Sequence, residues 1–231
     1  MAVEAARRLH DGAVCFVGIG LPSLACNLAR VTHAPGCVLI YESGTIGAKP
    51  VHLPLSIGDG ELAETADAVV SVPEIFSYWL QAGRVDVGFL SAAQIDRFGN
   101  LNSTVIGDYD RPKVRLPGGG GAPEIARSCR RVFVLLRQTP RAFVERLDFR
   151  SSVGDRVSVV VTALGVLEPD PASRELVLTH VHRGVSADDA RAATGWDLRV
   201  APTVRETEFP SPQELPALRA LKPATRDGNG G

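Results

Sequence analysis

Short apolar runs alternate with helix-like segments along the first half of the chain. Ala13 to Val17 and Cys37 to Tyr41 are continuous apolar runs, and Val85 to Leu90 is apolar apart from Asp86 and Gly88. Such runs are typical of strands buried on both faces of a parallel sheet. Segments that favour helix, such as residues 2–10 and 22–30, precede or follow these runs. Because parallel strands need long crossover connections, usually helices, this pattern predicts an α/β fold with an open, mostly parallel sheet.

The pattern changes after residue 149, where strand-like runs follow one another without helices between them. Val166 to Glu168 and Glu175 to Val181 are separated by a segment rich in turn residues. This arrangement predicts an antiparallel hairpin added to the parallel sheet near the C-terminal end. Ser186, with Asp189 three positions later, is close to a capping box and predicts the start of a short helix.

The length of 231 residues suits one large domain. We expect residues 1–201 to form this domain. From residue 202 onward the chain has five prolines and a glycine-rich end, which predicts an extended tail that is frayed at its terminus. Two Gly- and Pro-rich segments, 43–57 and 108–121, predict long loops, and loops of that length are often functional.

Composition and charge exclude several classes of function. Hydrophobic residues make up 45% of the chain and the net charge is −1, so no basic surface for nucleic acid or an anionic membrane is expected. No apolar run reaches the roughly 20 residues of a membrane span, and no signal-peptide pattern is present. The four cysteines form no C-x-x-C pair, which favours a reducing, cytoplasmic setting.

Glu42 is the first candidate for chemistry, because it ends the apolar run Cys37 to Tyr41 and precedes a sharp turn through Ser43 and Gly44. In open α/β sheets, ligands bind at the carboxyl ends of the strands. A carboxylate there is a candidate nucleophile, base or ligand anchor. Alternatively, Glu42 only caps the turn or bonds nearby backbone amides.

A run of four glycines, 118–121, leads into a predicted helix at Pro123. Such a loop lets backbone N–H groups approach an anion or a developing oxyanion closely. No Gly-Lys-Ser/Thr follows the run, so it is not the usual nucleotide-binding P-loop. A flexible surface loop is the alternative, although four glycines have a high entropic cost on folding.

Other motifs leave alternatives open. Gly18-x-Gly20 followed by Glu42 resembles a dinucleotide-binding layout, but it equally fits a compact strand-to-helix turn. The polar segment 94–102, which includes Asn100, could fix a substrate carbonyl or satisfy turn backbone groups. Arg111, Lys113 and Arg115 suggest contacts to anionic substrates or a solvated face. The histidines, including those at 180 and 182, lack metal-site spacing, and we expect no metal.

Three segments together resemble the β subunits of family I CoA-transferases: Tyr41–Gly44, Gln94–Thr104 and Leu116–Ala122. Segments 15–22 and 53–65 are most similar to the members of this family that act on 3-oxoadipate, and members that act on glutaconate are more distant. The resemblance covers residues 2–221. One departure is the absence of a longer Gly/Pro-rich insertion that these relatives carry just before Val157.

The resemblance implies a role for each matching residue. Glu42 corresponds to the catalytic glutamate that carries covalent acyl and CoA intermediates, and Gly119 and Gly120 to the backbone donors of an oxyanion hole. Asn100 corresponds to a turn residue that positions the thioester. The family fold is an open α/β/α sheet with helices on both faces, and it uses no metal and no cofactor beyond the CoA of the substrate.

The resemblance also implies a partner and a reaction. An α subunit, most simply in an α₂β₂ assembly, would complete the enzyme. Together they would move CoA from an acyl-CoA, succinyl-CoA by resemblance, to a dicarboxylic acid such as 3-oxoadipate in aromatic catabolism. The alternatives are a glutaconate or other dicarboxylate CoA-transferase, an acyl-CoA hydrolase on the same scaffold, and a non-catalytic module that binds a dinucleotide or sugar phosphate.

Overall fold

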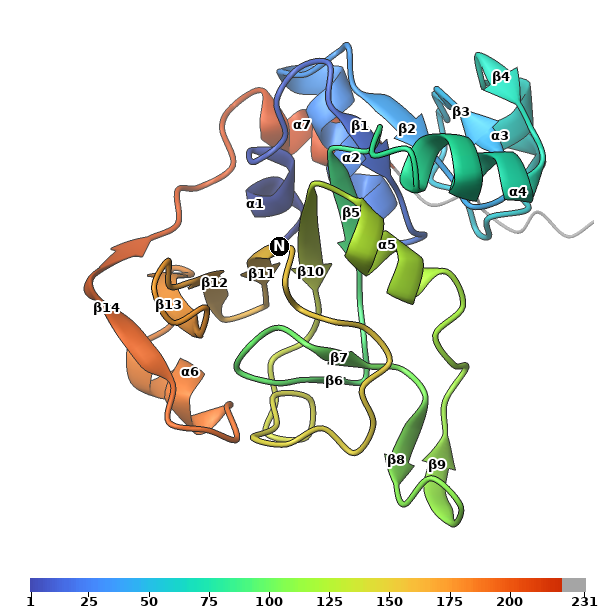
Figure 1. Ribbon diagram of the computed structural model, residues 1–231. Coiled ribbons are helices and arrows are strands. Elements are labelled where there is room, and N and C mark those ends of the chain that lie inside the picture. Colours follow the sequence, from blue (N-terminus) through green and yellow to red (C-terminus); the bar gives the residue numbers. More distant parts are fainter. Residues whose placement is uncertain (222–231) are drawn as a thin grey trace, which may run out of the picture. The chain divides into compact units, whose positions relative to one another are not determined.

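The computed structural model (Figure 1) describes residues 1–221, and its contacts gather in two compact units. The first unit comprises residues 2–75 together with the segment that starts at Pro210. The second unit comprises Phe76–Phe209. The predicted domain over residues 1–201 includes parts of both units, and each unit is described by itself.

The first unit contains a small sheet with helices. Its elements are α1 (Ala2–Ala6), β1 (Val14–Phe16), α2 (Leu21–Thr32), β2 (Val38–Ile40), β3 (Thr45–Ile46), α3 (Gly60–Glu64), β4 (Ala68–Val69), α4 (Val72–Glu74) and α7 (Glu214–Ala220). The strands β1 and β2 pair in parallel, whereas β2, β3 and β4 pair in antiparallel fashion. The predicted helix–strand alternation is confirmed here, while β3 lies inside a segment expected to be a loop.

Within the described residues, the second unit contains the larger share of the strands, and six of them pair in one series, here called the larger sheet. Its elements are η1 (Ile75–Leu80, a π-helical stretch that begins at the boundary), β5 (Val87–Leu90), β6 (Gln94–Ile95), β7 (Leu101–Asn102), β8 (Val105–Gly107), β9 (Pro112–Arg115), α5 (Ala122–Ser128), β10 (Arg131–Leu135), β11 (Val157–Val161), β12 (Gly165–Pro169), β13 (Leu176–Val181), α6 (Ala187–Ala192) and β14 (Arg199–Glu206). The strand order is β14-β13-β12-β11-β10-β5. The pairs β6–β7 and β8–β9 form two separate hairpins.

The pairing within the larger sheet confirms the predicted fold class. The strands β5, β10 and β11 are parallel, as their buried apolar runs indicate. The strands β12 and β13 form the predicted antiparallel hairpin, and β14 then pairs in parallel with β13. Ser186 caps α6 with a full capping box to Asp189, as predicted. The α/β class with a parallel sheet and an added antiparallel hairpin is therefore confirmed.

Helix α5 packs closely on the sheet of the second unit (Figure 1). A Cβ atom on Gly88 of β5 would lie 2.5 Å from Ile125 Cγ2 and 2.7 Å from Cys129 Sγ, so only glycine allows this approach. Burial raises the pKa of the Cys129 thiol to about 12, which keeps it in the inert thiol form. This packing fixes the helix that the glycine run enters.

The segment from residue 202 onward differs from the predicted extended tail. β14 continues to Glu206, and α7 is a helix that packs against α2. Pro216 is the third residue of α7, and proline is tolerated in the first turn of a helix. Arg7, which directly follows α1, binds the Glu214 carboxylate with two hydrogen bonds of 2.7 and 2.6 Å. The predicted frayed terminus, residues 222–231, lies outside the described residues.

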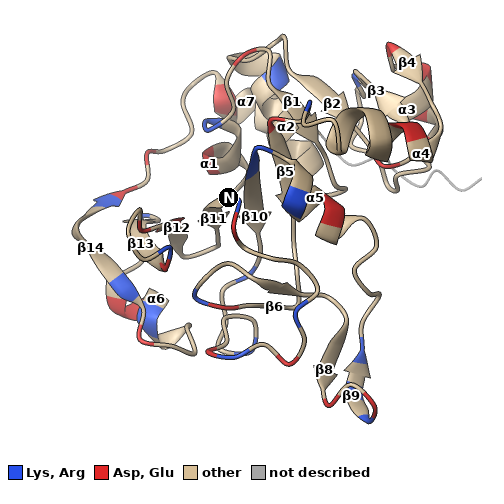
Figure 2. Ribbon diagram, viewed as in Figure 1, with Lys and Arg blue, Asp and Glu red and all other residues tan. Residues whose placement is uncertain are grey.

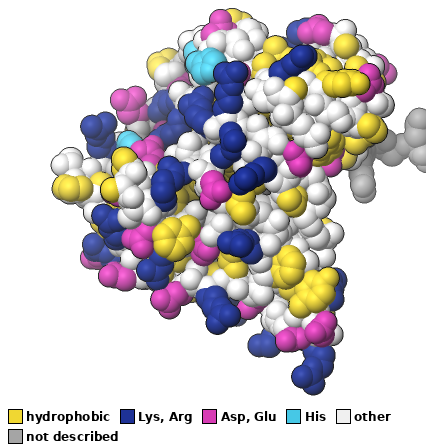
Figure 3. Space-filling view, viewed as in Figure 1, with side chains coloured by type: hydrophobic (Ala, Val, Ile, Leu, Met, Phe, Trp, Pro, Cys, Tyr) yellow, Lys and Arg dark blue, Asp and Glu magenta, His cyan; other side chains and the backbone are white. Residues whose placement is uncertain are grey.

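The surface is electrostatically mixed. Figure 2 shows acidic and basic positions distributed along the elements of both units, and Figure 3 shows the two kinds of side chain interspersed on one face. Among the described residues, no helix is both long and apolar enough to cross a membrane.

The Arg7–Glu214 pair makes a testable contribution to stability. The hydrogen bond from Arg7 lowers the pKa of the Glu214 carboxyl to about 2. A lowered pKa stabilises the folded state at pH values above the ordinary carboxyl pKa, and this contribution is lost as the pH falls toward 2. We expect Glu214→Gln to reduce the free energy of unfolding at pH 7 by roughly 1.5–3 kcal/mol.

Urea unfolding of the original chain and the variant at several pH values checks this prediction. The difference between the two should be full at pH 7 and should shrink as the pH falls below 4.5, the ordinary value for this carboxyl. Glu64→Gln, at an exposed position of α3, is the matched control and should change little at any pH. A difference for Glu214→Gln that stays constant down to pH 3 would contradict the account.

Candidate active site

Glu42 lies in a tight turn between β2 and β3, as the sequence predicts. The Gly44 N–H donates to the Tyr41 carbonyl at 3.0 Å, and the Tyr41 N–H donates to the Thr45 carbonyl at 3.0 Å. Glu42 and Ser43 are therefore the two central residues of the turn, and Glu42 is partly exposed. The turn presents the Glu42 carboxylate at the carboxyl end of β2, which is the usual position for ligand binding in such folds.

Gly44 closes the turn against a strand that the sequence does not reveal. Its φ of +109° is a conformation that other residues rarely adopt. A Cβ atom at this position would lie 2.0 Å from the Val70 carbonyl oxygen, just after β4. The Val70 N–H in turn donates to the Gly44 carbonyl at 2.9 Å. The backbone of residue 70 thus locks the turn that carries Glu42.

A buried polar network holds Tyr41, the residue that precedes Glu42 in the turn. The Tyr41 hydroxyl lies 2.9 Å from Ser23 Oγ on α2, and the Asn27 side chain donates to the Ser23 carbonyl at 2.9 Å. Arg30 donates to Asn27 Oδ1 at 3.2 Å. Burial raises the pKa of the Tyr41 phenol well above its ordinary value, so this ring stays neutral and protonated.

This network was not predicted, although the sequence contains a signal for it. Ser23, Asn27 and Arg30 follow each other at helical spacing on an otherwise apolar helix, so they share one face. A polar stripe on a buried helix needs partners in the core. Tyr41, the last residue before the turn, provides one of them.

Two hydroxyl groups beside Glu42 lack hydrogen-bond partners. Ser43 Oγ and Thr45 Oγ1 are both buried, and no partner for either is present among residues 1–221. A buried unsatisfied hydroxyl costs about 1–3 kcal/mol. Such costs call for an explanation in a native fold and often mark functional positions. The turn therefore has unused hydrogen-bonding capacity next to its carboxylate.

The glycine run lies in the second unit and ends in free backbone donors. The Gly118 N–H donates to the Ser103 carbonyl at 2.9 Å, which anchors the start of the run. The N–H groups of Gly119 and Gly120 have no hydrogen-bond partner within residues 1–221. Gly119 is half-buried and Gly120 is exposed. Two consecutive unpaired N–H groups just before a helix have the capacity to bind an oxyanion.

Asn100 is held inside its own turn. Its Nδ2 donates to Asp96 Oδ2 at 2.9 Å, and its Oδ1 accepts from the Gly154 N–H at 3.0 Å. Both ends of the amide therefore have a partner, and the side chain ties the turn at residues 96–100 to the segment that ends at Gly154. This geometry fits the second interpretation of the polar segment, in which its amides satisfy the turn. A substrate contact of Asn100 stays a prediction.

The side-chain amides of Gln94 and Asn102 also form hydrogen bonds within the protein. Asn102 Nδ2 donates to Gln94 Oε1 and to the Val105 carbonyl, both at 2.7 Å. Gln94 Nε2 donates to Asp148 Oδ2 at 2.9 Å. Both amide side chains are buried, so they stabilise the β6–β7 hairpin and its surroundings.

The predicted site residues thus fall into two groups. Glu42 belongs to the first unit, whereas Gly119, Gly120 and Asn100 belong to the second. Within the second unit, the glycine run and the Asn100 turn are connected, because the Ser103 N–H donates to Ser151 Oγ at 3.0 Å beside the segment that Asn100 binds.

The remaining candidates have structural partners or lie in solvent. His182 lies 2.9 Å from both Thr207 Oγ1 and the Thr162 carbonyl, so its ring is part of the β13–β14 edge. In the described part of the chain, no group of three or more His, Cys, Asp or Glu side chains could hold a metal ion. The basic residues around β9, which are Arg111, Lys113 and Arg115, are all exposed.

The sequence of this chain is similar to those of known CoA-transferases. The family model described as "Coenzyme A transferase" matches residues 1–193. A subunit of the 3-oxoadipate CoA-transferase of Pseudomonas knackmussii is 56% identical over 100% of this chain and 94% of that protein. A subunit of the glutaconate CoA-transferase of Acidaminococcus fermentans is 33% identical over 94% of this chain and 89% of its own length.

Solved structures agree with the sequence matches. The crystal structure of glutaconate coenzyme A-transferase from A. fermentans has a TM-score of 0.88 at 28% identity, and it covers 96% of this chain and 92% of that chain. The structure of the decarboxylase AibA/AibB also has a TM-score of 0.88, at 30% identity and with the same coverage. The scaffold is therefore shared by proteins whose names indicate different reactions.

Proposed function

Because the chain belongs to the coenzyme A transferase family, we propose that it is the subunit that carries the nucleophile, Glu42, of an enzyme that moves CoA from an acyl-CoA to a dicarboxylic acid. The observation that carries this proposal is the turn at Glu42. A partly exposed carboxylate is presented at a strand end by a backbone that Gly44 and Val70 lock in place. A nucleophile must be held in one geometry to react efficiently.

The proposed reaction proceeds through two covalent states of Glu42. The carboxylate attacks the thioester carbonyl of the donor acyl-CoA, which gives a mixed anhydride and the CoA thiolate. The thiolate then attacks the Glu42 carbonyl of the anhydride, so the donor leaves as its carboxylate and Glu42 holds CoA as a thioester. The acceptor acid reverses both steps. The exchange conserves the energy of the thioester, since no water takes part.

Each step forms a tetrahedral oxyanion that needs hydrogen-bond donors. Gly119 and Gly120 are the proposed donors, because their N–H groups are unpaired within the described residues. One such donor typically contributes about 3 kcal/mol to transition-state stabilisation. Water must be excluded, because hydrolysis of the Glu42 thioester would release free CoA without transfer.

The proposed acceptor is 3-oxoadipate and the proposed donor is succinyl-CoA, in the catabolism of aromatic compounds. The support is the identity of 56% to a 3-oxoadipate CoA-transferase subunit, against 33% to a glutaconate CoA-transferase subunit. We expect the assembled enzyme to prefer 3-oxoadipate when both acids compete at equal concentration. A strong preference for glutaconate would contradict the proposed substrate and leave the transferase reaction intact.

The proposed partner is a CoA-transferase α subunit in an α₂β₂ assembly. The first unit exposes several large apolar side chains, which are Val51, Leu55, Ile57, Val69 and Val72. Val69 directly precedes Val70, whose backbone locks the Glu42 turn, and Val72 follows two positions later. A partner seated on this surface would contact the segment that positions the nucleophile, which supports a heteromeric enzyme.

We expect the isolated chain to be inactive and to gain CoA-transferase activity when it is purified together with the α subunit. Val69→Asp places a charge on the exposed apolar surface, so it should weaken the complex without unfolding the chain. The measurements are size-exclusion chromatography of the mixture and the rate of acyl-CoA formation from the acceptor acid. Full transferase activity of the isolated chain would refute the requirement for a partner. Release of free CoA without an acceptor acid would instead indicate a hydrolase.

A further inference from the structure

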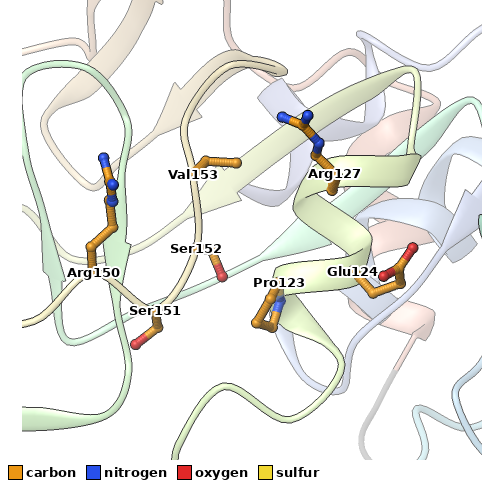
Figure 4. Close-up of a pocket in the computed structure, with 7 residues that line it drawn as sticks. All are labelled: Pro123, Glu124, Arg127, Arg150, Ser151, Ser152 and Val153. Carbon is orange, nitrogen blue, oxygen red and sulfur yellow. The ribbon is translucent and has the colours of Figure 1, made fainter.

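Two hollows lie near helix α5 in the second unit. The first, the α5 groove, has a volume of about 360 Å³ and lies between Pro123, Glu124 and Arg127 of α5 and residues 150–153 (Figure 4). The second, the arginine hollow, has a volume of about 410 Å³ and lies where β10 and β11 begin. Arg127 of the groove lies 3.5 Å from Asp155, which lines the hollow. One residue of each space therefore takes part in this ion pair.

The arginine hollow carries excess positive charge. Four arginines line it together with two acidic residues, so its formal charge is 4 − 2 = +2: Arg130, Arg131, Arg156 and Arg174 with Asp155 and Glu168. Arginine presents a planar fork of donors that matches phosphate oxygens. The volume lies within the range of about 300–1,000 Å³ that is usual for small-molecule sites. The hollow thus has the charge and the size for a phosphate-bearing ligand.

Three of these arginines are held in place by the protein while other donors of each guanidinium remain. Arg156 Nη1 donates to the Cys129 carbonyl at 3.1 Å, and Arg174 Nη2 donates to the Asp155 carbonyl at 2.9 Å. Arg130 Nη1 lies 3.2 Å from an Asp86 carboxylate oxygen. Each contact fixes one side of the fork, which reduces the entropy lost when a ligand binds the other side.

The backbone at Arg174 supports the same interpretation. Arg174 has a φ of +62° and is the only described residue other than glycine with a positive φ. Its N–H donates to the Asp170 carbonyl at 2.8 Å, which holds this conformation. A left-handed conformation at a residue other than glycine is strained, and such strain gathers at functional positions.

The α5 groove differs in character from the arginine hollow. Glu124 lines the groove together with Arg127 and Arg150, and Pro123 and Val153 contribute apolar surface. The groove therefore has a formal charge of +1 against +2 in the arginine hollow, and its Arg127 is already paired with an acidic residue. The arginine hollow is the more cationic of the two and suits the phosphate end of a ligand better. The glycine run precedes the first residue of α5, whereas the arginine hollow lies beyond its last residue. Seven helical residues span about 10 Å.

We propose that the arginine hollow binds phosphate groups. Two sources have this chemistry: the nucleotide end of CoA, which carries a 3′-phosphate and a pyrophosphate, and free pyrophosphate. For CoA, the less polar pantetheine arm would run through the α5 groove toward Gly119 and Gly120. This source rests on the proposed function, whereas phosphate binding by the arginine hollow does not.

The test uses the assembled complex of this chain with its α subunit and three variants of this chain. Arg130→Gln and Arg156→Gln each remove one cation from the arginine hollow, and a double variant removes both. Arg191→Gln, on α6 and paired with Asp188 at 2.9 Å, is the matched control outside the hollow. Thermal unfolding checks that the variants fold. Arg130 is 68% exposed, so its single variant decides the result if the double variant unfolds.

Calorimetric titration with inorganic pyrophosphate measures binding without any turnover. We expect each single variant to weaken binding roughly tenfold and the double variant to weaken it further, since each loses one charge-assisted contact. Arg191→Gln should bind as the original complex does. If CoA is the source, the same variants raise the KM for acyl-CoA, while the KM for the acyl-pantetheine thioester, which lacks phosphates, is unchanged.

The outcomes distinguish CoA from free pyrophosphate as the ligand, and they also show whether the arginine hollow binds phosphate at all. Weaker pyrophosphate binding with an unchanged KM for acyl-CoA supports the arginine hollow as a site for free phosphate-type anions. Weaker binding together with the KM change supports the CoA source. If pyrophosphate does not bind, or binds equally to the original complex and the double variant, and the KM values are equal, the proposal is wrong. The pyrophosphate titration still tests phosphate binding by the arginine hollow even if the complex catalyses no CoA transfer.

Discussion

Glu42→Gln is expected to abolish CoA transfer by the assembled enzyme. The variant keeps the size and much of the hydrogen-bonding capacity of the side chain, but it removes the anion that is the proposed nucleophile in both covalent states. Loss of a nucleophile that forms a covalent intermediate typically costs on the order of 10⁴-fold or more in turnover. The measurement is the initial rate of acyl-CoA formation from succinyl-CoA and the acceptor acid.

The control for this experiment is Glu64→Gln, an exposed position on α3 in the same unit. It should leave turnover unchanged. Both variants should fold and bind the α subunit as the original chain does, because Glu42 is partly exposed and, within residues 1–221, the turn is held by backbone hydrogen bonds rather than by its side chain. Near-normal turnover of Glu42→Gln would mean that another group is the nucleophile.

Gly44→Ala should have the second largest effect, on stability and on turnover together. The added Cβ would lie 2.0 Å from the Val70 carbonyl oxygen in a backbone with φ of +109°, so the turn or the segment at Val70 has to move. Overpacking and backbone strain of this kind cost roughly 2–4 kcal/mol. A shift of the carboxylate by about 1 Å is enough to cost around 10²-fold in rate.

Thermal unfolding and turnover of the Gly44→Ala enzyme check this prediction. Gly58→Ala is the matched control, because a Cβ there has its nearest neighbour at 3.8 Å and the glycine does not have a positive φ. The control should retain both stability and rate. Equal behaviour of the two variants would show that the lock between Gly44 and Val70 does not position the turn.

Local patterns were sufficient to predict the strand before Glu42 and the turn that follows it. The apolar run at residues 37–41 ends abruptly at a charge and a glycine, and both signals act over neighbouring residues. The hairpin of β12 and β13 and the capping box at Ser186 follow from equally local chemistry. These features are present in the structure as the sequence indicates.

Features that depend on distant contacts could not be predicted in the same way. The strand β4 has only two residues, which are apolar but exposed. A run this short does not distinguish a strand from a loop, although Val70 beside it locks the turn that carries Glu42. Helix α7 forms where prolines suggest an extended tail, because Arg7, 207 positions away, binds Glu214. Stability of these elements comes from tertiary packing rather than from local propensity.

The scaffold alone does not determine the reaction, because a decarboxylase and a CoA-transferase match this chain with the same TM-score of 0.88. Function is therefore set by the residues of the site. In this chain the proposed reaction depends on the Glu42 carboxylate, because the proposed oxyanion donors have a role in CoA transfer only if that carboxylate acts as the nucleophile.

The most direct test is the mass of this chain after the assembled enzyme is incubated with acyl-CoA in the absence of an acceptor acid. The account predicts that the chain gains the mass of CoA less one water, that peptide mapping places the group on Glu42, and that borohydride converts this side chain to an alcohol. No adduct at all, or an adduct that maps to another residue such as Glu124, would contradict the central claim that Glu42 is the nucleophile.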